Sequence, residues 1–158
     1  MWMNYLRPGS LLLLLLCCLL MGCNTTRTEW VHRGEWVYRN ESTHEIRITG
    51  VIISFTTEKF GTLVLSPGET HTVEFLSDGE RDIPPAAIGF PLEDTYGERE
   101  CSITVDGTTT LLLEPDKDIR DRDAYEVEKL GRAHYRFTYT LTDEFADRLL
   151  ESAAAPSE

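Results

Sequence analysis

The sequence is short of positive charge. It carries 15 lysine and arginine residues against 27 aspartate and glutamate residues, a formal net charge of −12 over 158 residues. Binding to nucleic acid depends on basic patches that displace counterions from phosphates, so nucleic acid is excluded as a partner. An anionic membrane surface would also repel such a chain, so any membrane attachment has to come from something other than charge.

Long apolar runs are scarce as well. The one clear run, Leu11–Leu20, follows a start whose only charge is Arg7, and the small residue Gly22 stands just behind it. Ten residues span ~15 Å as a helix, half of a hydrocarbon core of ~30 Å. A basic start, a short apolar middle and a small residue at the end are typical of a secretory signal peptide. The sequence therefore predicts that residues 1–22 are a targeting segment.

Few cysteines remain beyond that segment. Cys17 and Cys18 lie inside the apolar run, Cys23 stands at its boundary, and Cys101 is alone in the body of the chain. If Cys23 is otherwise used, Cys101 has no partner for an intramolecular disulfide. It alternates with two apolar residues in 101–105, which predicts a small buried residue on a strand. A nucleophile is the alternative, but no histidine or basic residue stands in register with it.

Motifs of the common enzyme classes are missing too. The chain has no G-x-S-x-G elbow, no phosphate-cradling glycine loop and no H-E-x-x-H pair. Its histidines show no metal-ligand spacing and none lies near a cysteine; they are His32, His44, His71 and His134. The prediction is a protein that is not an enzyme and has no dissociable cofactor.

What is present begins with the boundary of the apolar run. Leu20, Met21, Gly22 and Cys23 resemble a bacterial lipobox, the pattern Leu, a tolerant position, Gly or Ala, then Cys. The resemblance implies that the Cys23 thiol is acylated with palmitate-type chains and that a lipoprotein signal peptidase recognises residues 20–22 and cuts before Cys23. Ordinary cleavage that leaves a spare thiol is the alternative, but the Ala-x-Ala pattern it prefers is missing.

The residues after Cys23 indicate to which membrane the lipoprotein is sorted. Asn24 is not the aspartate that typically retains enterobacterial lipoproteins at the inner membrane, and residues 24–28 are neutral to basic rather than the acidic export signal of surface lipoproteins. The expected location is the cell envelope, lipid-anchored at the outer membrane and facing the periplasm, with surface exposure left open.

From Glu35 onward, alternating apolar residues indicate short β-strands. The apolar residues stand at even positions before Gly50 and at odd positions after it, which predicts a bulge at this glycine. The pairs Pro67-Gly68 and Asp106-Gly107 predict tight turns. Thr142 starts an amphipathic helical pattern. We therefore predict an all-β antiparallel sandwich, immunoglobulin-like, with a short C-terminal helix. The expected division is a signal peptide at 1–22, a lipidated tether at 23–34, the sandwich at 35–152 and a disordered tail at 153–158.

Two stretches interrupt the strand pattern. Residues 76–98 contain three prolines and read as a long connection, with 86–90 as a possible short strand; long loops often carry binding sites. Residues 116–128 are rich in acidic side chains, and four of them are candidate calcium ligands: Asp116, Asp118, Asp121 and Asp123. The run does not match an EF-hand and basic residues partly neutralise it, so a solvated loop with local ion pairs is the favoured interpretation.

Aromatic residues are a weaker indication of a binding site. Trp30, Trp36 and Tyr96 could stack on a sugar, although Trp36 is more readily explained as core and Trp30 as tether.

A second resemblance rests on loose motifs spread over residues 36–150. The segments 38–42, 46–48, 67–69, 103–107 and 139–144 are similar to those of short uncharacterised lipoproteins of Bacteroidetes, in which an N-terminal lipid precedes a β-sandwich. The resemblance implies a fold and an anchor but no activity.

Together these features predict a cell-envelope lipoprotein whose membrane-tethered β-sandwich is a non-catalytic binding or scaffold module. Its partners would be the membrane, through the lipid on Cys23, and an envelope protein or glycan. The alternative is a carbohydrate- or calcium-binding accessory lipoprotein.

Overall fold

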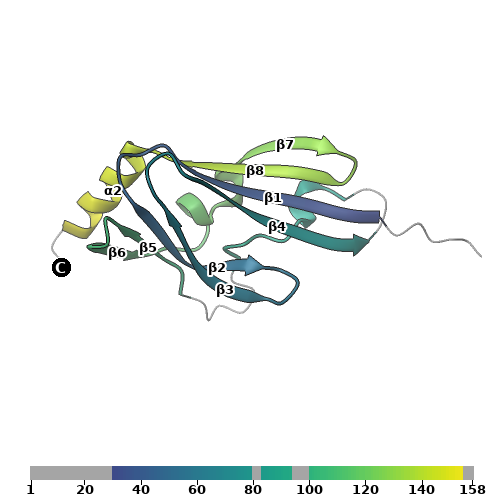
Figure 1. Cartoon of the computed structure of the whole chain (residues 1–158), viewed down its shortest axis with the longest axis horizontal. Coiled ribbons are helices and arrows are strands. Elements are labelled where there is room, and N and C mark those ends of the chain that lie inside the picture. Colours follow the sequence, from purple (N-terminus) through teal and green to yellow (C-terminus); the bar gives the residue numbers. More distant parts are fainter. Residues whose placement is uncertain (1–29, 80–82, 94–99, 155–158) are drawn as a thin grey trace, which may run out of the picture.

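A computed structural model describes residues 30–79, 83–93 and 100–154, which form two four-stranded sheets packed face to face (Figure 1). The strands are β1 (Trp30–Asn40), β2 (Ile46–Ser54), β3 (Lys59–Leu65), β4 (Thr70–Gly79), β5 (Ser102–Val105), β6 (Thr109–Leu112), β7 (Glu126–Gly131) and β8 (His134–Leu141). The helices are the 3₁₀ turns η1 (Pro85–Ala87), η2 (Asp118–Arg120) and η3 (Arg122–Ala124) and the α-helix α2 (Asp143–Ala154). The predicted β-sandwich is confirmed.

The strand orders are β4-β1-β8-β7 in one sheet and β3-β2-β5-β6 in the other. β1 pairs with β4, and β2 pairs with β5, which continues into β6. In an immunoglobulin domain strand B pairs with strand E in one sheet, while strands C, F and G lie together in the other. Here β1 and β4 take the positions of B and E, and β2, β5 and β6 take those of C, F and G.

One pairing departs from the antiparallel prediction. β1 and β8 are parallel, in register from Arg33 opposite His134 to Asn40 opposite Leu141. Both strands run toward the end of the sandwich that carries α2 (Figure 1). The β7–β8 hairpin therefore fills the position beside β1, and the first and last strands of the described fold are neighbours.

Several predicted boundaries shift. β1 begins at Trp30, so residues 30–34 are strand rather than tether: all of them pair with β4, and from Arg33 onward the strand also pairs with β8. β7 lies partly within the stretch expected to be an acidic loop. The helix runs to Ala154, two residues into the expected tail, whose remaining residues lie outside the described part.

The core is rich in aromatic side chains. Trp36 is fully buried and stacks on Phe137, with ring centroids 4.0 Å apart and planes 12° apart. Phe90 and Tyr125 pack against the same indole at 4.8 and 5.2 Å. Cys101 is also buried, as its alternation predicted, and its thiol donates to the carbonyl oxygen of Gly50 at 3.6 Å.

The predicted turn chemistry is confirmed at two glycines. Gly50 has φ of +86°, and the β2–β3 register shifts between Thr49 and Val51, which places a bulge there. A Cβ at Gly50 would lie 2.8 Å from the carbonyl oxygen of Glu100, so the position has no space for a side chain. Asp106 and Gly107 have φ of +51° and +66°, as a type I′ hairpin requires.

The later half of the connection at 83–93 packs into the sandwich, while Pro84, Ala86 and Ala87 stay exposed. Ile88, Phe90 and Leu92 are buried in the core, and the Ile52 N–H donates to the carbonyl oxygen of Pro91 at 2.8 Å. The possible strand at 86–90 is not formed, because η1 occupies its start. Proline fixes φ and lacks a donor, so this segment fills space without joining either ladder.

The helix forms as its sequence predicts. The Phe145 N–H donates to the Thr142 hydroxyl at 3.3 Å, and acidic residues occupy the first turn, where they complement the helix dipole. Phe145 and Ala146 are buried, and α2 closes the end of the sandwich beside β5 and β6 (Figure 1). Within residues 30–79, 83–93 and 100–154, no helix combines the length and apolarity needed to cross a bilayer.

Candidate functional site

A pocket of about 650 Å³ lies where the segment leaving the core at Phe90 meets the loop after β6. Its floor and walls combine apolar side chains with charges of both signs. The lining residues are Phe90, Leu92, Glu93, Pro115, Asp116, Arg120, Asp121, Arg122 and Asp123. Its volume falls within the range of small-molecule sites, while its lining is more polar than most.

Short-range hydrogen bonds shape the loop. Asp116 and Asp118 have φ of +54° and +50°, a left-handed conformation that aspartate tolerates better than most residues. The Asp121 carboxylate accepts the N–H of Asp123 at 2.9 Å and so starts η3. The Tyr125 hydroxyl donates to the carbonyl oxygen of Ile119 at 2.8 Å and ties η2 to the core. The loop backbone is therefore defined locally.

Arg120 is the most unusual residue of the pocket. Its side chain is only 7% exposed, and its Nη1 donates to the carbonyl oxygen of Leu113 at 2.8 Å. Within the described part of the chain, no carboxylate lies within 4.0 Å of the guanidinium of Arg120 or Arg122. Buried charges in proteins are usually paired, so this arrangement is electrostatically costly.

Arg122 is held rigidly beside it. Its Nη1 donates to the carbonyl oxygen of Ala86, and its Nη2 to that of Ile88 at 2.6 Å. The guanidinium carbon lies 5.5 Å from the Trp36 ring centroid and 5.4 Å from that of Phe90, within cation–π range. Burial lowers the pKa of Arg122, and the charges of Glu93 and Asp123 oppose that shift. The pocket wall is thus fastened to the 83–93 segment.

The four candidate calcium ligands separate into two groups. Asp116, Asp121 and Asp123 line the pocket, whereas Asp118 pairs with Arg148 of α2 at 3.4 Å. Among residues 30–79, 83–93 and 100–154, no three His, Cys, Asp or Glu side chains form a group that could hold a metal ion. Two ion pairs involve this region, Asp118 with Arg148 of α2 and Glu114 with Lys117, whereas Arg120 and Arg122 do not form the expected local ion pairs with described residues.

The remaining predicted site residues lie elsewhere. Trp36 is core rather than a surface platform, and Trp30 opens β1. Tyr96, Cys23 and the recognition residues Leu20, Met21 and Gly22 lie outside the described residues.

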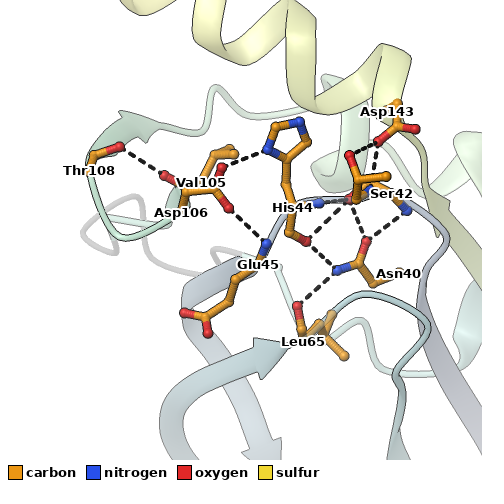
Figure 2. A network of polar contacts seen from close by, with 10 residues as sticks. Asn40, Ser42, His44, Glu45, Leu65, Val105, Asp106, Thr108 and Asp143 are labelled. Carbon is orange, nitrogen blue, oxygen red and sulfur yellow. Dashed lines mark hydrogen bonds and ion pairs between the residues drawn. The ribbon is translucent and has the colours of Figure 1, made fainter.

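A polar network joins three parts of the chain near α2 (Figure 2). The buried Asn40 amide donates to the carbonyl oxygens of His44 and Leu65, both at 2.8 Å. Its own oxygen accepts the N–H and the hydroxyl of Ser42 at 3.0 and 2.6 Å. Every hydrogen-bonding group of this side chain is used, so Asn40 fixes the turn between β1 and β2.

Ser42, His44 and Asp106 have the composition of a catalytic triad but not its geometry. His44 Nδ1 lies 2.6 Å from Asp106 Oδ2, as in a triad. The Ser42 hydroxyl, however, donates to Asn40 and contacts the main chain of His44 at 3.3 Å rather than the imidazole (Figure 2). The serine is only 3% exposed, so it supports the turn and has no access to a substrate.

A second ionic cluster lies on the outer face of the β1–β8 pair. Glu35 accepts from Arg136 Nη2 at 2.8 Å and lies 2.9 Å from His134 Nε2. Burial raises the pKa of Glu35, but the hydrogen bonds and charges of Arg136 and His134 outweigh it and keep that pKa below its usual value. The cluster joins β1 to β8 and is structural.

No protein-family model, curated protein or solved structure matches the chain. The fold and site therefore define the protein only as a β-sandwich with a mixed-charge pocket. Sequence reasoning had singled out the aspartates of this pocket but treated Arg120 and Arg122 only as charges that neutralise them. An apolar residue, Ile119, stands next to Arg120 within the acidic run. It is the sequence signal that could have suggested a loop packed against the core.

Proposed function

We propose that the protein is a cell-envelope lipoprotein, anchored by acyl chains on Cys23, whose β-sandwich is a non-catalytic binding module that takes its ligand in the pocket beside Arg120. The lipobox resemblance at residues 20–23 supports the anchor. Two or three acyl chains, at about 0.8 kcal/mol per buried CH₂, would hold the domain permanently at a membrane.

The start of the fold is compatible with such an anchor. Only residues 24–29 separate Cys23 from β1, so the Trp30 end of the sandwich would lie close to the lipid surface. β1 leads from there to Asn40, and α2 lies at the opposite end (Figure 1). The tether would confine the pocket near the membrane and raise its effective concentration toward envelope ligands.

The single observation that supports binding is the pocket itself. Its two guanidinium groups are fixed by main-chain carbonyl oxygens of Leu113, Ala86 and Ile88, so they are oriented before any ligand arrives. Preorganised polar groups lose little conformational entropy when they bind.

The anchor is tested by membrane fractionation of the Cys23→Ala variant, with mass spectrometry of the N-terminal peptide. We expect the wild type in the membrane fraction with an acylated Cys23, and the variant unprocessed and without that modification. Cys18→Ala, within the apolar run, is the matched control and should behave as the wild type does. Identical processing and lipid content in Cys23→Ala and wild type would refute the anchor.

A carbohydrate ligand is the second candidate. It is favoured by the coexistence of fixed donors on Arg122 and acceptors on Asp121 and Asp123, because sugar hydroxyls both donate and accept. Calorimetry with a panel of neutral oligosaccharides tests it. Binding that is lost in Asp123→Asn would support it, and an absence of heat with every sugar would reject it.

A further inference from the structure

The pocket carries opposite charges at different depths, and this bears on the class of ligand it takes. The inference rests on the proposed function in one respect, namely that the pocket is a binding site. Arg120 is more than nine-tenths buried, whereas Glu93, Asp116 and Asp123 are exposed at the rim. The carboxylates of Asp116 and Asp123 are therefore more exposed than the guanidinium of Arg120.

The guanidinium of Arg120 has no carboxylate partner among the described residues, and its remaining N–H groups stay accessible rather than fully buried. It has five N–H donors, and one hydrogen bond, to the carbonyl oxygen of Leu113, is made. A buried cation is stabilised by a charge-assisted hydrogen bond, and a planar guanidinium matches a carboxylate in two-point geometry. An anionic group of the ligand would complete this interaction.

A simple anion does not fit the rest of the pocket. Even without Glu93, three carboxylates line it, those of Asp116, Asp121 and Asp123, against two guanidinium groups. An isolated anion such as phosphate would be repelled by this excess of negative charge. A simple cation would be attracted to the rim but would leave the positive charge of Arg120 uncompensated.

We infer that the pocket binds a small zwitterion, an amino acid or short peptide with both termini free, whose carboxylate pairs with Arg120 and whose ammonium group lies among the rim carboxylates of Asp116 and Asp123. Opposite charges of one ligand then satisfy opposite charges of the site. A volume of about 650 Å³ accommodates a peptide of a few small residues.

Calorimetry on the protein purified from the envelope compares Ala-Ala with two blocked forms. N-acetyl-Ala-Ala lacks the positive charge and Ala-Ala-amide lacks the negative one. We expect binding of Ala-Ala and at least tenfold weaker binding of each blocked form. Equal binding of the N-acetylated form, or of inorganic phosphate alone, would identify a simple anion site and overturn the inference. Absence of binding by all these probes would also overturn it, whereas the anchor is judged separately by fractionation.

Variants separate the two halves of the site. Arg120→Met keeps an unbranched apolar stem but removes the guanidinium and its charge, and it should abolish binding of Ala-Ala. Asp116→Asn and Asp123→Asn change exposed carboxylates and should each weaken it several-fold while the fold is kept. Asp118→Asn, whose carboxylate pairs with Arg148 outside the pocket, is the control and should bind as the wild type does. If Arg120→Met does not fold, the aspartate variants still decide the question: unchanged affinity in both would contradict the inference.

Discussion

The Nδ1 atom of His44 lies 2.6 Å from Oδ2 of Asp106, which joins the segment before β2 to the hairpin turn between β5 and β6. The same aspartate accepts the Glu45 N–H at 2.9 Å through its other oxygen. Asp143, at the start of α2, accepts the Thr43 N–H at 2.7 Å (Figure 2). One short segment therefore holds both the hairpin and the helix.

This contact makes stability depend on pH. The hydrogen bond to Asp106 raises the pKa of His44 above its ordinary 6.5, with a small opposing effect of burial, and it lowers the pKa of Asp106 below its ordinary 3.8. The His44 contribution is complete below pH 6.5 and is lost as pH rises through the raised pKa; that of Asp106 is lost only as pH falls below 3.8.

We therefore expect the melting temperature of the wild type to fall more between pH 6 and pH 9 than that of His44→Gln. Thermal unfolding followed by circular dichroism measures both, with His71→Gln, an exposed position on β4, as the control. Parallel pH profiles of His44→Gln and the wild type would contradict this assignment.

Asp106 also has a backbone role that can be separated from its charge. Its φ of +51° suits asparagine nearly as well as aspartate but not alanine, and an asparagine oxygen can still accept the Glu45 N–H. We expect Asp106→Asn to melt between the wild type and Asp106→Ala in scanning calorimetry at pH 6. Equal melting temperatures of the two variants would mean that only the charge matters.

Replacing Asn40 should be among the most damaging single changes. In Asn40→Ala the carbonyl oxygens of His44 and Leu65 and the N–H of Ser42 lose their bonds to this side chain, at roughly 1–3 kcal/mol for each buried group that stays unsatisfied, whereas the Ser42 hydroxyl keeps its contacts with the main chain of His44. We expect a loss of about 3 kcal/mol in chemical denaturation, and a smaller loss of about 1 kcal/mol for Ser42→Ala. A loss below that of Ser42→Ala would show that water replaces the amide.

Gly34 lets the 83–93 segment approach β1. A Cβ at this position would lie 2.3 Å from Cγ2 of Ile88, so Gly34→Ala must displace that segment. Overpacking of this kind lowers the free energy of unfolding by about 1–3 kcal/mol. Because the Ile88 carbonyl oxygen holds Arg122, ligand binding should weaken as well. Gly131→Ala, whose Cβ would meet only an ordinary contact at 3.8 Å, is the control for urea unfolding and should change neither property.

Counting thiols tests the anchor independently. Cys101 is 1% exposed, so a thiol reagent should reach it only after unfolding. We expect the mature protein to react with no thiol equivalent when native and with one in denaturant, because an acylated Cys23 is a thioether. Two equivalents in denaturant would show that Cys23 is free, and the Cys101→Ala variant identifies which cysteine reacts.

Local rules predicted the parts of the fold that depend on local chemistry. The bulge at Gly50 and the hairpin at Asp106-Gly107 each follow from a positive φ that few residues adopt. The alternation in 135–141 predicted β8 because one face of that strand is buried. The capping residue Thr142 likewise set the start of the helix, since its hydroxyl accepts a main-chain N–H.

Such local rules do not predict features that depend on contacts between distant parts of the chain. β7 lies at a sheet edge with Glu126, Val127 and Glu128 all exposed, so it shows no alternation to detect. The parallel pairing of β1 with β8 joins strands a hundred residues apart, and no local pattern records it. Arg120 was missed because its burial depends on the core that Ile119 and Tyr125 reach, which spacing alone does not reveal.

The position of β1 has a mechanical consequence. It is an inner strand, paired with β4 from Trp30 to Arg39 and with β8 from Arg33 to Asn40. A load applied from the Trp30 end acts along this strand, so it shears many hydrogen bonds on both edges at once instead of opening them one by one. The domain should therefore resist unfolding by force applied at its Trp30 end far better than its modest size suggests.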